Sequence, residues 1–557
     1  NNVKRFEANN NGVHVTGSFS TDTGTGSLTY PASDGTANQY LKTNGSGTLS
    51  WGTVSASLVS DSLFNTNGGT DAGAVLDGVN AVRNTLFGYK TGAQITTAEE
   101  NTAMGYKSCG GFNTGTNYTT GDSNTCIGYQ SGTFISTGYN NTLLGVQTCN
   151  NLTTGFDNIS IGNYSNVGTT GFYNISIGSA SGYNLTTGHN NVQIGRNAGH
   201  DQTTGDYNVA IGSYAGYANV GTDNQIFIGG YAGRYCSTGT NNLAIGFEAL
   251  FNTTTNDNNI AIGYRALKSC TANANIAIGL NAGDAITNGS YNTILGYQAM
   301  SAATTGDNNI VIGKEAGTYQ NGQYNVVIGY EAGAGTNSTG DHNIFLGRQA
   351  GYDITTGYNN VGIGENSLTN ITTAFNNVGV GIDTLKSNIT GTLNVAIGTN
   401  ALESNTTDEN TAIGYKSLDS CTSGDANTAI GSKSGESITT GNYNCLIGRS
   451  AGDAITTGAK NVMIGMMAGD GVNTDNSIFI GYQAGYSSGG NTAPRNHLIG
   501  YLAGSSITTG SDAVCLGSES LKSLTTGNFN TCIGNYSGYS FTTSTGNVTL
   551  GYAAAYS

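Results

Sequence analysis

The sequence predicts an all-β protein folded as a parallel β-solenoid, a β-roll of about 28 coils with about 17 residues per coil. The first observation behind this is composition: 87 of the 557 residues are glycine and only 2 are proline, which is far from the usual globular mixture. The second is a repeat, Asn-x-x-Ile-Gly, whose glycine occurs 28 times from Gly88 to Gly551, at intervals that are nearly all 16 to 18 residues. A unit this short has no core of its own, so neighbouring copies must bury one another's apolar side chains.

The first part of the chain lacks the repeat. We therefore divide the sequence into a small β-rich N-terminal module, residues 1–80, and the repeat array, residues 81–557. Two segments stand out within the module, Asp34–Gln39 (Asp-Gly-Thr-Ala-Asn-Gln) and Gly47–Trp51 (Gly-Thr-Leu-Ser-Trp). We interpret the module as the part that attaches the array to a larger structure.

Each coil of the array contains a short strand that ends at the repeated glycine, which we number position 0. Position −4 is asparagine in nearly every copy, and the apolar or threonine side chains at −3 and −1 share one face of the strand. Position −2 points the other way and is also mostly apolar, so both faces of the strand are predicted to be buried. Two coils show these positions: Asn208, Ala210, Ile211, Gly212 and Ala215 in one, and Asn394, Val395, Ile397, Gly398 and Ala401 in the other.

The second half of each coil is predicted to form a turn and a return strand. Position +3 is Ala, Ser or Thr in all 28 copies, which indicates that only a small side chain fits there. Position +4 is usually Gly or Leu, and a polar turn that often contains Thr-Thr-Gly follows. Two strands of about five residues and two corners would fill the coil as a flattened, two-sided roll. At about 4.8 Å per coil the array would be on the order of 130 Å long.

The apolar character of position −2 predicts self-association. One strand face of a lone two-sided roll points into water, yet position −2 is polar in only four copies, Ser160, Ser176, Gln193 and Thr549. An apolar stripe along the whole array would exceed what soluble monomers expose. We therefore expect the −2 stripes of several chains to meet along a common axis, with a homotrimer as the expected assembly.

These repeats resemble the head domain of trimeric autotransporter adhesins, a left-handed parallel β-roll built on repeats close to Asn-Ser-Val-Ala-Ile-Gly. The nearest matches are Asn208–Gly212 and Asn394–Gly398, and the resemblance covers roughly residues 80–557. It implies that the coils are left-handed. The segments Asp34–Gln39 and Gly47–Trp51 are similar to short β-rich modules of phage tail-fibre and related virion proteins. The heptad stalk and membrane anchor of those adhesins, and the C-terminal chaperone of such fibres, are not seen in the sequence.

Charge and motif content exclude several function classes. The net charge of −15 comes from 34 acids and 19 bases that are scattered along the chain, so nucleic-acid binding is not expected. No apolar stretch is long enough for a membrane helix, so we expect no membrane insertion. The five histidines lie far apart, and nucleophile, phosphate-loop and zinc motifs are missing. We therefore expect no enzymatic activity, no cofactor and no metal.

The aspartates before the strand have two interpretations, and the cysteines have one. Asp206, Asp307 and Asp341 lie just before the asparagine of the next strand, where aspartate accepts local backbone hydrogen bonds; a shared calcium ion is the alternative. Nine cysteines with irregular spacing indicate neither a disulfide framework nor a zinc site. Cys515 and Cys532 occupy position −2 of adjacent coils and are expected to be small buried hydrophobes.

Two enlarged loops are the candidate binding sites, with Phe112 and Tyr118 in the first and Asn491 and Arg495 in the second. Tyrosine often follows the repeated glycine, and we expect these rings to stack between coils. Exposed rings of this kind also offer contacts to a host surface glycan. The asparagines at −4 are expected to form an amide ladder.

The sequence thus predicts a structural protein of a virion or of an extracellular or cell surface. The first hypothesis is the rod-like shaft or spacer of a tail fibre or similar appendage, which mediates attachment and binds its virion or cell-surface partner through the N-terminus. The alternative is a subunit of a secreted or cell-surface adhesive filament, stacked end to end because full motifs continue to Gly551. A polysaccharide-cleaving tailspike ranks below both, since it needs acids clustered in a groove.

Overall fold

The computed structural model describes residues 59–110, 119–487 and 492–556, together with short segments among the first 53 residues. This described part consists of strands, turns and irregular segments, and it contains no helix. Contacts divide the chain into two compact units, Asn1–Tyr164 and Ser165–Ser557. The prediction of an all-β parallel solenoid with about 17 residues per coil is confirmed.

The N-terminal part of the first unit contains antiparallel pairs of very short strands. The strongest is a five-residue hairpin in which Leu41 lies opposite Trp51, and the indole Nε1 of Trp51 donates to the Ser33 carbonyl at 2.9 Å. The pairs are β1 (Glu7–Asn9) with β2 (Gly12–His14), β3 (Ser20–Asp22) with β4 (Ser27–Thr29), and β5 (Gln39–Thr43) with β6 (Leu49–Thr53).

The parallel ladder of the first unit begins before residue 81. Strand β7 (Val59–Ser60) pairs antiparallel with β8 (Thr66–Gly68), and β8 pairs parallel with the next strand in the register of the repeat. Asn65 and Gly69 therefore occupy positions −4 and 0 of a coil that precedes the first marker, and Gly69 has the positive φ of that position, 118°. The later strands are β9 (Thr85–Phe87), β10 (Thr102–Met104), β11 (Thr125–Ile127), β12 (Thr142–Leu144) and β13 (Ile159–Ile161).

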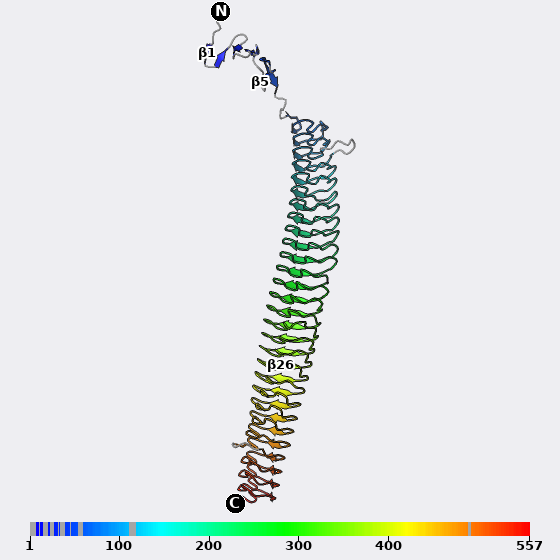
Figure 1. The fold of residues 1–557 in the computed structure, drawn as a ribbon. Coiled ribbons are helices and arrows are strands. Elements are labelled where there is room, and N and C mark those ends of the chain that lie inside the picture. The colour runs from blue at the N-terminus through cyan, green and yellow to red at the C-terminus, as the bar shows by residue number, and fades with distance from the viewer. Residues whose placement is uncertain are drawn as a thin grey trace, which may run out of the picture. The chain divides into compact units, whose positions relative to one another are not determined.

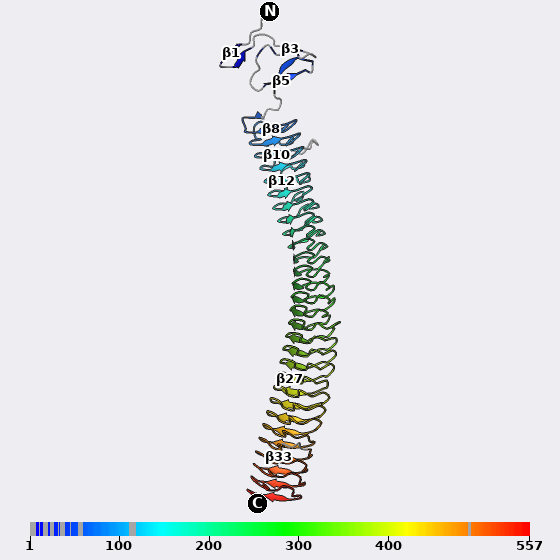
Figure 2. The same ribbon diagram turned by 60° about the vertical axis from the view of Figure 1, so that its left-hand side comes forward.

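The second unit is a continuous parallel ladder in which each strand pairs in register with the strand of the next coil (Figures 1 and 2). Successive coils stack above one another, so the same repeat position recurs in a column. Its strands are β14 (Ile175–Ile177), β15 (Val192–Ile194), β16 (Val209–Ile211), β17 (Ile226–Ile228), β18 (Leu243–Ile245), β19 (Ile260–Ile262), β20 (Ile276–Ile278), β21 (Thr293–Leu295), β22 (Ile310–Ile312), β23 (Val326–Ile328), β24 (Ile344–Leu346), β25 (Val361–Ile363), β26 (Val378–Val380), β27 (Val395–Ile397), β28 (Thr411–Ile413), β29 (Thr428–Ile430), β30 (Cys445–Ile447), β31 (Val462–Ile464), β32 (Ile478–Ile480), β33 (His497–Ile499), β34 (Val514–Leu516), β35 (Thr531–Ile533) and β36 (Val548–Leu550).

The expectation of two five-residue strands per coil is wrong, because each described coil has a single strand of three residues. The residue at position +2 adopts a left-handed conformation in every coil from β9 onward, with φ between 50° and 61°. Position +4 is also left-handed in most coils, as at Gly351 and Leu368, with φ of 61° and 57°. Each left-handed residue reverses the chain direction, so the return side of the coil is a series of turns held by hydrogen bonds to the neighbouring coils.

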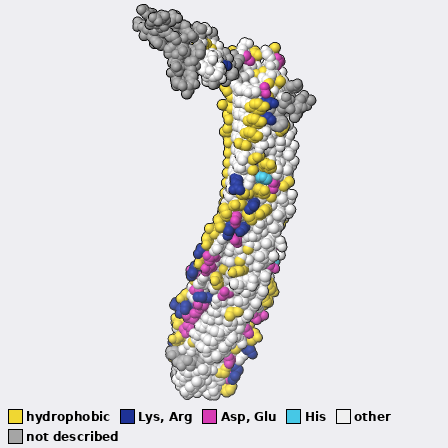
Figure 3. Space-filling view, turned by 45° about the horizontal axis from the view of Figure 1, so that its top comes forward, with side chains coloured by type: hydrophobic (Ala, Val, Ile, Leu, Met, Phe, Trp, Pro, Cys, Tyr) yellow, Lys and Arg dark blue, Asp and Glu magenta, His cyan; other side chains and the backbone are white. Residues whose placement is uncertain are grey.

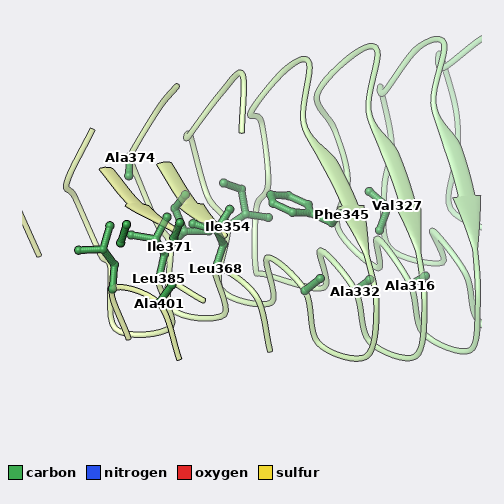
Figure 4. Close-up of a cluster of buried hydrophobic side chains, with 14 of the residues drawn as sticks. Ala316, Val327, Ala332, Phe345, Ile354, Leu368, Ile371, Ala374, Leu385 and Ala401 are labelled. Atoms are coloured by element: carbon green, nitrogen blue, oxygen red, sulfur yellow. The ribbon is translucent and has the colours of Figure 1, made fainter. Parts of the chain in front are cut away.

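The core of each coil is narrow and is filled by positions −2, +3, +4 and +7. Volumes at −2 and +4 compensate in several coils, where a large side chain at one position meets glycine at the other. Phe345 at −2 faces Gly351 at +4, where an added Cβ would lie 2.6 Å from the phenyl ring. In the next coil Gly362 occupies −2, and Leu368 at +4 fills the space (Figure 4). The small residues predicted at +3 are confirmed as core residues, for example Ala332, which is fully buried.

The predicted orientation of the strand is wrong. Position −2 points into the coil, since Phe227, Val311 and Met463 have at most 1% of their surface exposed. Positions −3 and −1 point outward and are half-buried or exposed, as for Ile310 and Ile278, which are 42% and 39% exposed. The −2 stripes therefore cannot meet a second chain, because the side chains of their own coil surround them.

The predicted asparagine ladder at position −4 is confirmed and connects successive coils from inside. The backbone N–H of Asn427 donates to Oδ1 of Asn410 at 3.0 Å, and its Nδ2 donates to the carbonyl of Gly441 at 2.8 Å. Both asparagines are fully buried. Each amide thus satisfies backbone groups at a corner where the strand ladder has not yet begun.

Candidate functional site

The structure places only one of the four predicted binding-loop residues. Phe112, Tyr118 and Asn491 lie outside the described residues. Arg495 occupies position −5 of its coil and makes a bidentate ion pair with Asp512 of the next coil, Nε to Oδ1 at 2.6 Å and Nη2 to Oδ2 at 3.0 Å. Arg495 therefore joins two coils, and its guanidinium is already paired.

The outward strand face of the second unit is an apolar surface. Columns of isoleucine, valine and leucine at −3 and −1 follow the ladder from β14 to β36, interrupted at −3 by threonine in four coils, by Cys445 and by His497. Many of these side chains are more than one third exposed, for example Ile226, Ile344, Ile397 and Leu516. With about 4.8 Å per coil the columns extend on the order of 100 Å. We call this surface the strand face.

The predicted stacking of aromatic rings at position +1 is confirmed in both units. In the first unit Tyr89, Tyr106 and Tyr129 form a continuous stack, with ring centroids 5.3 and 5.2 Å apart. In the second unit Tyr482 stacks on Tyr501 at 5.5 Å. These rings stay partly exposed, at 38% to 50% of their surface. Stacking between coils thus uses the ring faces, while the ring edges remain in contact with solvent.

A second aromatic group surrounds a single arginine at position +5 and was missed in the sequence. The Cζ atom of Arg234 lies 5.0 to 6.0 Å from the centroids of five rings, those of Tyr214, Tyr217, Tyr231, Tyr235 and Phe251. We call these six residues the Arg234 cluster. The sequence does contain a signal for this cluster, because position +5 is His200, Tyr217, Arg234 and Phe251 in four consecutive coils. The signal appears only when the same position is compared between neighbouring coils.

The aspartates before the strand accept backbone hydrogen bonds, but the donors lie in the neighbouring coil and not in the local backbone that we predicted. Oδ1 of Asp206 accepts the backbone N–H of His189 at 2.7 Å, and Oδ1 atoms of Asp307 and Asp341 accept equivalent bonds at 2.7 Å. The donor belongs to the preceding coil in each case. Among the described residues, no group of three or more His, Cys, Asp or Glu side chains is arranged to hold a metal ion.

Five consecutive coils near the C-terminal end of the second unit carry an acid at position +5. Glu403, Asp419, Glu436, Asp453 and Asp470 form this acidic column. Lys416 and Lys433 from position +2 pair with two of them, Asp419 at 3.3 Å and Glu436 at 3.0 Å. Burial and a hydrogen bond to the neighbouring Asp470 carboxyl raise the pKa of Asp453 to about 7, further helped by the charge of Glu436 and opposed by Lys433.

This raised pKa predicts a local pH dependence of stability. The native chain keeps a proton on Asp453 up to about pH 7, whereas an unfolded carboxyl loses it near its ordinary pKa of 3.8. The native state therefore binds more protons between these values, and stability falls as the pH rises through this window. We expect Asp453→Asn to stabilise these coils at pH 8 by about 1 kcal/mol, because a half-buried carboxyl is partly screened by solvent.

Hydrogen exchange of the peptides around β30 and β31 at pH 5 and pH 8 measures this effect. Asp425→Asn is the control, since Asp425 occupies the outer corner of its coil and not the acidic column. Equal protection at both pH values in the wild-type chain would contradict the prediction.

Cysteine and histidine side chains are parts of the coil interior and surface. Cys515 and Cys532 lie opposite each other in β34 and β35 and are buried, as predicted, and burial raises the pKa of both thiols.

The rings of His189, His200 and His342 stack on aromatic rings of adjacent coils, and the ring centroids of His189 and Phe172 lie 3.7 Å apart. Stacking therefore accounts for these three histidines.

Comparisons of the chain with protein-family models, with curated proteins and with solved structures found no match. Within the described residues no helix is long and apolar enough to cross a membrane. The strand face, the aromatic stacks and the Arg234 cluster are thus the surfaces on which a functional argument rests.

Proposed function

We propose that this chain is a structural fibre protein, the shaft or spacer of a virion tail fibre or a similar surface appendage. The observation that carries the proposal is the uninterrupted parallel ladder of the second unit, in which every coil repeats the same inward and outward positions. Such a stack places whatever is joined to its two ends a fixed distance apart. A solenoid of this kind gains its stability from contacts between neighbouring coils, so it can be extended by repetition.

The proposed assembly is a homotrimer that buries the strand face. The two columns of half-exposed Ile, Val and Leu over about 100 Å far exceed the few hundred Å² of contiguous apolar surface found on soluble monomers. The occupant is a second copy of this chain, because only an equally long and equally flat apolar surface matches the columns coil by coil. The number three follows from the resemblance of the repeats to the trimeric adhesin heads.

Charges placed on the strand face should disrupt this assembly. We expect the wild-type chain to have about three times the protomer mass of 56.9 kDa in multi-angle light scattering. A variant with aspartate at position −1 of four consecutive coils, replacing Ile262, Ile278, Leu295 and Ile312, should shift toward the protomer mass. Each aspartate would bury an unpaired charge in an apolar interface, at a cost of several kcal/mol.

The matched control carries four aspartates on exposed turn positions of the same region, replacing Thr254, Thr271, Asn288 and Thr305. It adds the same charge at a similar spacing and should remain trimeric. A wild-type mass of one protomer in native buffer would refute the trimer. Electron microscopy of the same sample separates the alternatives further, since rods that continue end to end would favour a filament subunit.

A further inference from the structure

The guanidinium of Arg234 has no acidic partner among the described residues. Neither Arg234 nor the nearby Arg196 forms an ion pair with any carboxylate of the described residues, although acids outnumber bases by 34 to 19. The acids of neighbouring coils are already engaged: Asp201 with His200 at 2.7 Å, and Glu248 with Arg265 at 2.8 Å and Lys268 at 3.2 Å. Arg234 thus keeps an unneutralised charge on an acidic protein.

The cluster also leaves hydrogen-bond donors of Arg234 without acceptors. Its Nε atom is buried and has no hydrogen-bond partner, and no other described residue accepts a bond from its guanidinium. The surrounding rings hold one edge of the guanidinium away from water by cation–π contacts. A guanidinium fixed in this way has its remaining donors preorganised for an acceptor from solvent, and it binds carboxylates through parallel hydrogen bonds.

An aromatic platform lies beside this charge. Tyr235 is 40% exposed, its ring meets the ring of Phe251 edge to face at 5.1 Å, and its centroid lies 5.0 Å from Cζ of Arg234. On the other side Tyr214 lies between two guanidiniums, and its hydroxyl accepts a bond from Nη2 of Arg196 at 3.0 Å. The cluster and the adjacent Arg196 therefore bring a flat apolar ring, phenol hydroxyls and two cations together within a few coils.

We propose that the Arg234 cluster binds a carboxylate-bearing sugar, with the pyranose ring on Tyr235 and the carboxylate on the guanidinium of Arg234. The inference deepens the proposed function, since a surface fibre meets acidic glycans. A polyanion such as nucleic acid fits less well, because the nearby cations Arg265 and Lys268 are paired with Glu248 and the chain has a net charge of −15. The sugar class is shared by uronic acids and sialic acids. The cluster lies on the turns at positions +2, +5 and +6, so it is separate from the columns at −3 and −1.

Saturation-transfer NMR with the full chain tests the proposal with four probes. These are methyl β-D-glucuronide, the methyl α-glycoside of N-acetylneuraminic acid, the neutral methyl β-D-glucoside and a thymidylate pentamer. We expect saturable binding of at least one acidic sugar, at least tenfold stronger than that of the neutral glucoside. The acidic sugar that binds more tightly identifies the source, uronate or sialate. Binding of the pentamer in preference to both sugars would overturn the assignment, as would equal binding of the neutral sugar or no binding of either acidic sugar.

Variants then assign the interaction to the cluster. Arg234→Gln should weaken binding of the acidic sugar at least tenfold, and Arg234→Lys should weaken it less, because it keeps the charge but loses the paired donors. Tyr235→Ala should weaken the acidic and neutral sugars alike. Arg449→Gln, in a distant coil, is the control and should bind as the wild-type chain does.

Unchanged binding by Arg234→Gln would overturn the proposal. A thermal unfolding curve for each variant shows that the fold is kept, and the light-scattering mass of the same sample is read separately. A chain that is monomeric and still binds the acidic sugar through Arg234 refutes the trimer and keeps the site. A trimeric chain that binds no acidic sugar does the reverse.

Discussion

Replacing Gly229 with alanine should destabilise the coils around β17 and β18 by about 3 kcal/mol or more. Gly229 occupies position 0 with φ of 132°, a conformation that residues with a Cβ rarely adopt. An added Cβ would lie 2.5 Å from the carbonyl oxygen of Gly246 in the next coil, well inside van der Waals contact. Both coils would have to separate, which would break the backbone bonds on each side. Hydrogen exchange of peptides covering residues 224–250 measures the loss.

The neighbouring glycine provides the control. Gly230 lacks the left-handed conformation, and its added Cβ would meet only the side chain of Phe247, at 3.3 Å from Cδ2. Because the Phe247 ring is 41% exposed, it can move aside, and Gly230→Ala should be nearly neutral. Equal protection of the two alanine variants would show that the close approach of the coils at position 0 does not determine which residue this position tolerates.

The sequence predicts those parts of the fold in which a residue packs against the same repeat position of the coils above and below it. Glycine at 0, a small residue at +3 and asparagine at −4 each recur because a coil meets copies of itself above and below. A requirement at such a position is therefore repeated in every coil. The residues per coil follow from this repetition alone, and so does the number of coils except for the one at Asn65–Gly69 that precedes the first marker.

The direction of the strand faces could not be predicted from alternation, because positions −3, −2 and −1 are all apolar. The signal that separates them is volume. Position −2 ranges from glycine at Gly362 to phenylalanine at Phe345 and compensates with position +4, as only an interior position must. Positions −3 and −1 are instead mostly β-branched residues, which fits a flat outward surface.

The return side of the coil could not be predicted for a different reason. Its shape depends on left-handed residues at position +2, such as Tyr214, Glu248 and Lys416, which have no common side-chain chemistry. The hydrogen bonds between coils impose this left-handed conformation, so position +2 shows no preference for a residue type in the sequence. The Arg234 cluster was missed for a related reason, since it exists only where columns of adjacent coils meet.

Replacing Asn360 with alanine should cost about 3 to 5 kcal/mol, the other large effect that we expect. The Asn360 side chain is fully buried and connects three coils. Its Nδ2 donates to Oδ1 of Asn343 at 3.1 Å and to the carbonyl of Ala374 at 2.9 Å. Its Oδ1 accepts both the backbone N–H and the side-chain Nδ2 of Asn377, each at 3.1 Å. Alanine removes all four bonds and leaves their partners buried without water.

Asn288→Ala is the matched control for this change, because Asn288 is exposed and its Oδ1 accepts only a long bond of 3.5 Å from the hydroxyl of Thr271. Water replaces that bond at little cost, so Asn288→Ala should unfold as the wild-type chain does. Exchange of the Asn377 amide provides the local readout for Asn360→Ala. If this amide stays as protected as in the wild-type chain, the ladder is not what holds the corner, and the backbone bonds of the strands suffice. If it exchanges early, each buried asparagine secures the register of the next coil, and the array depends on all of its copies.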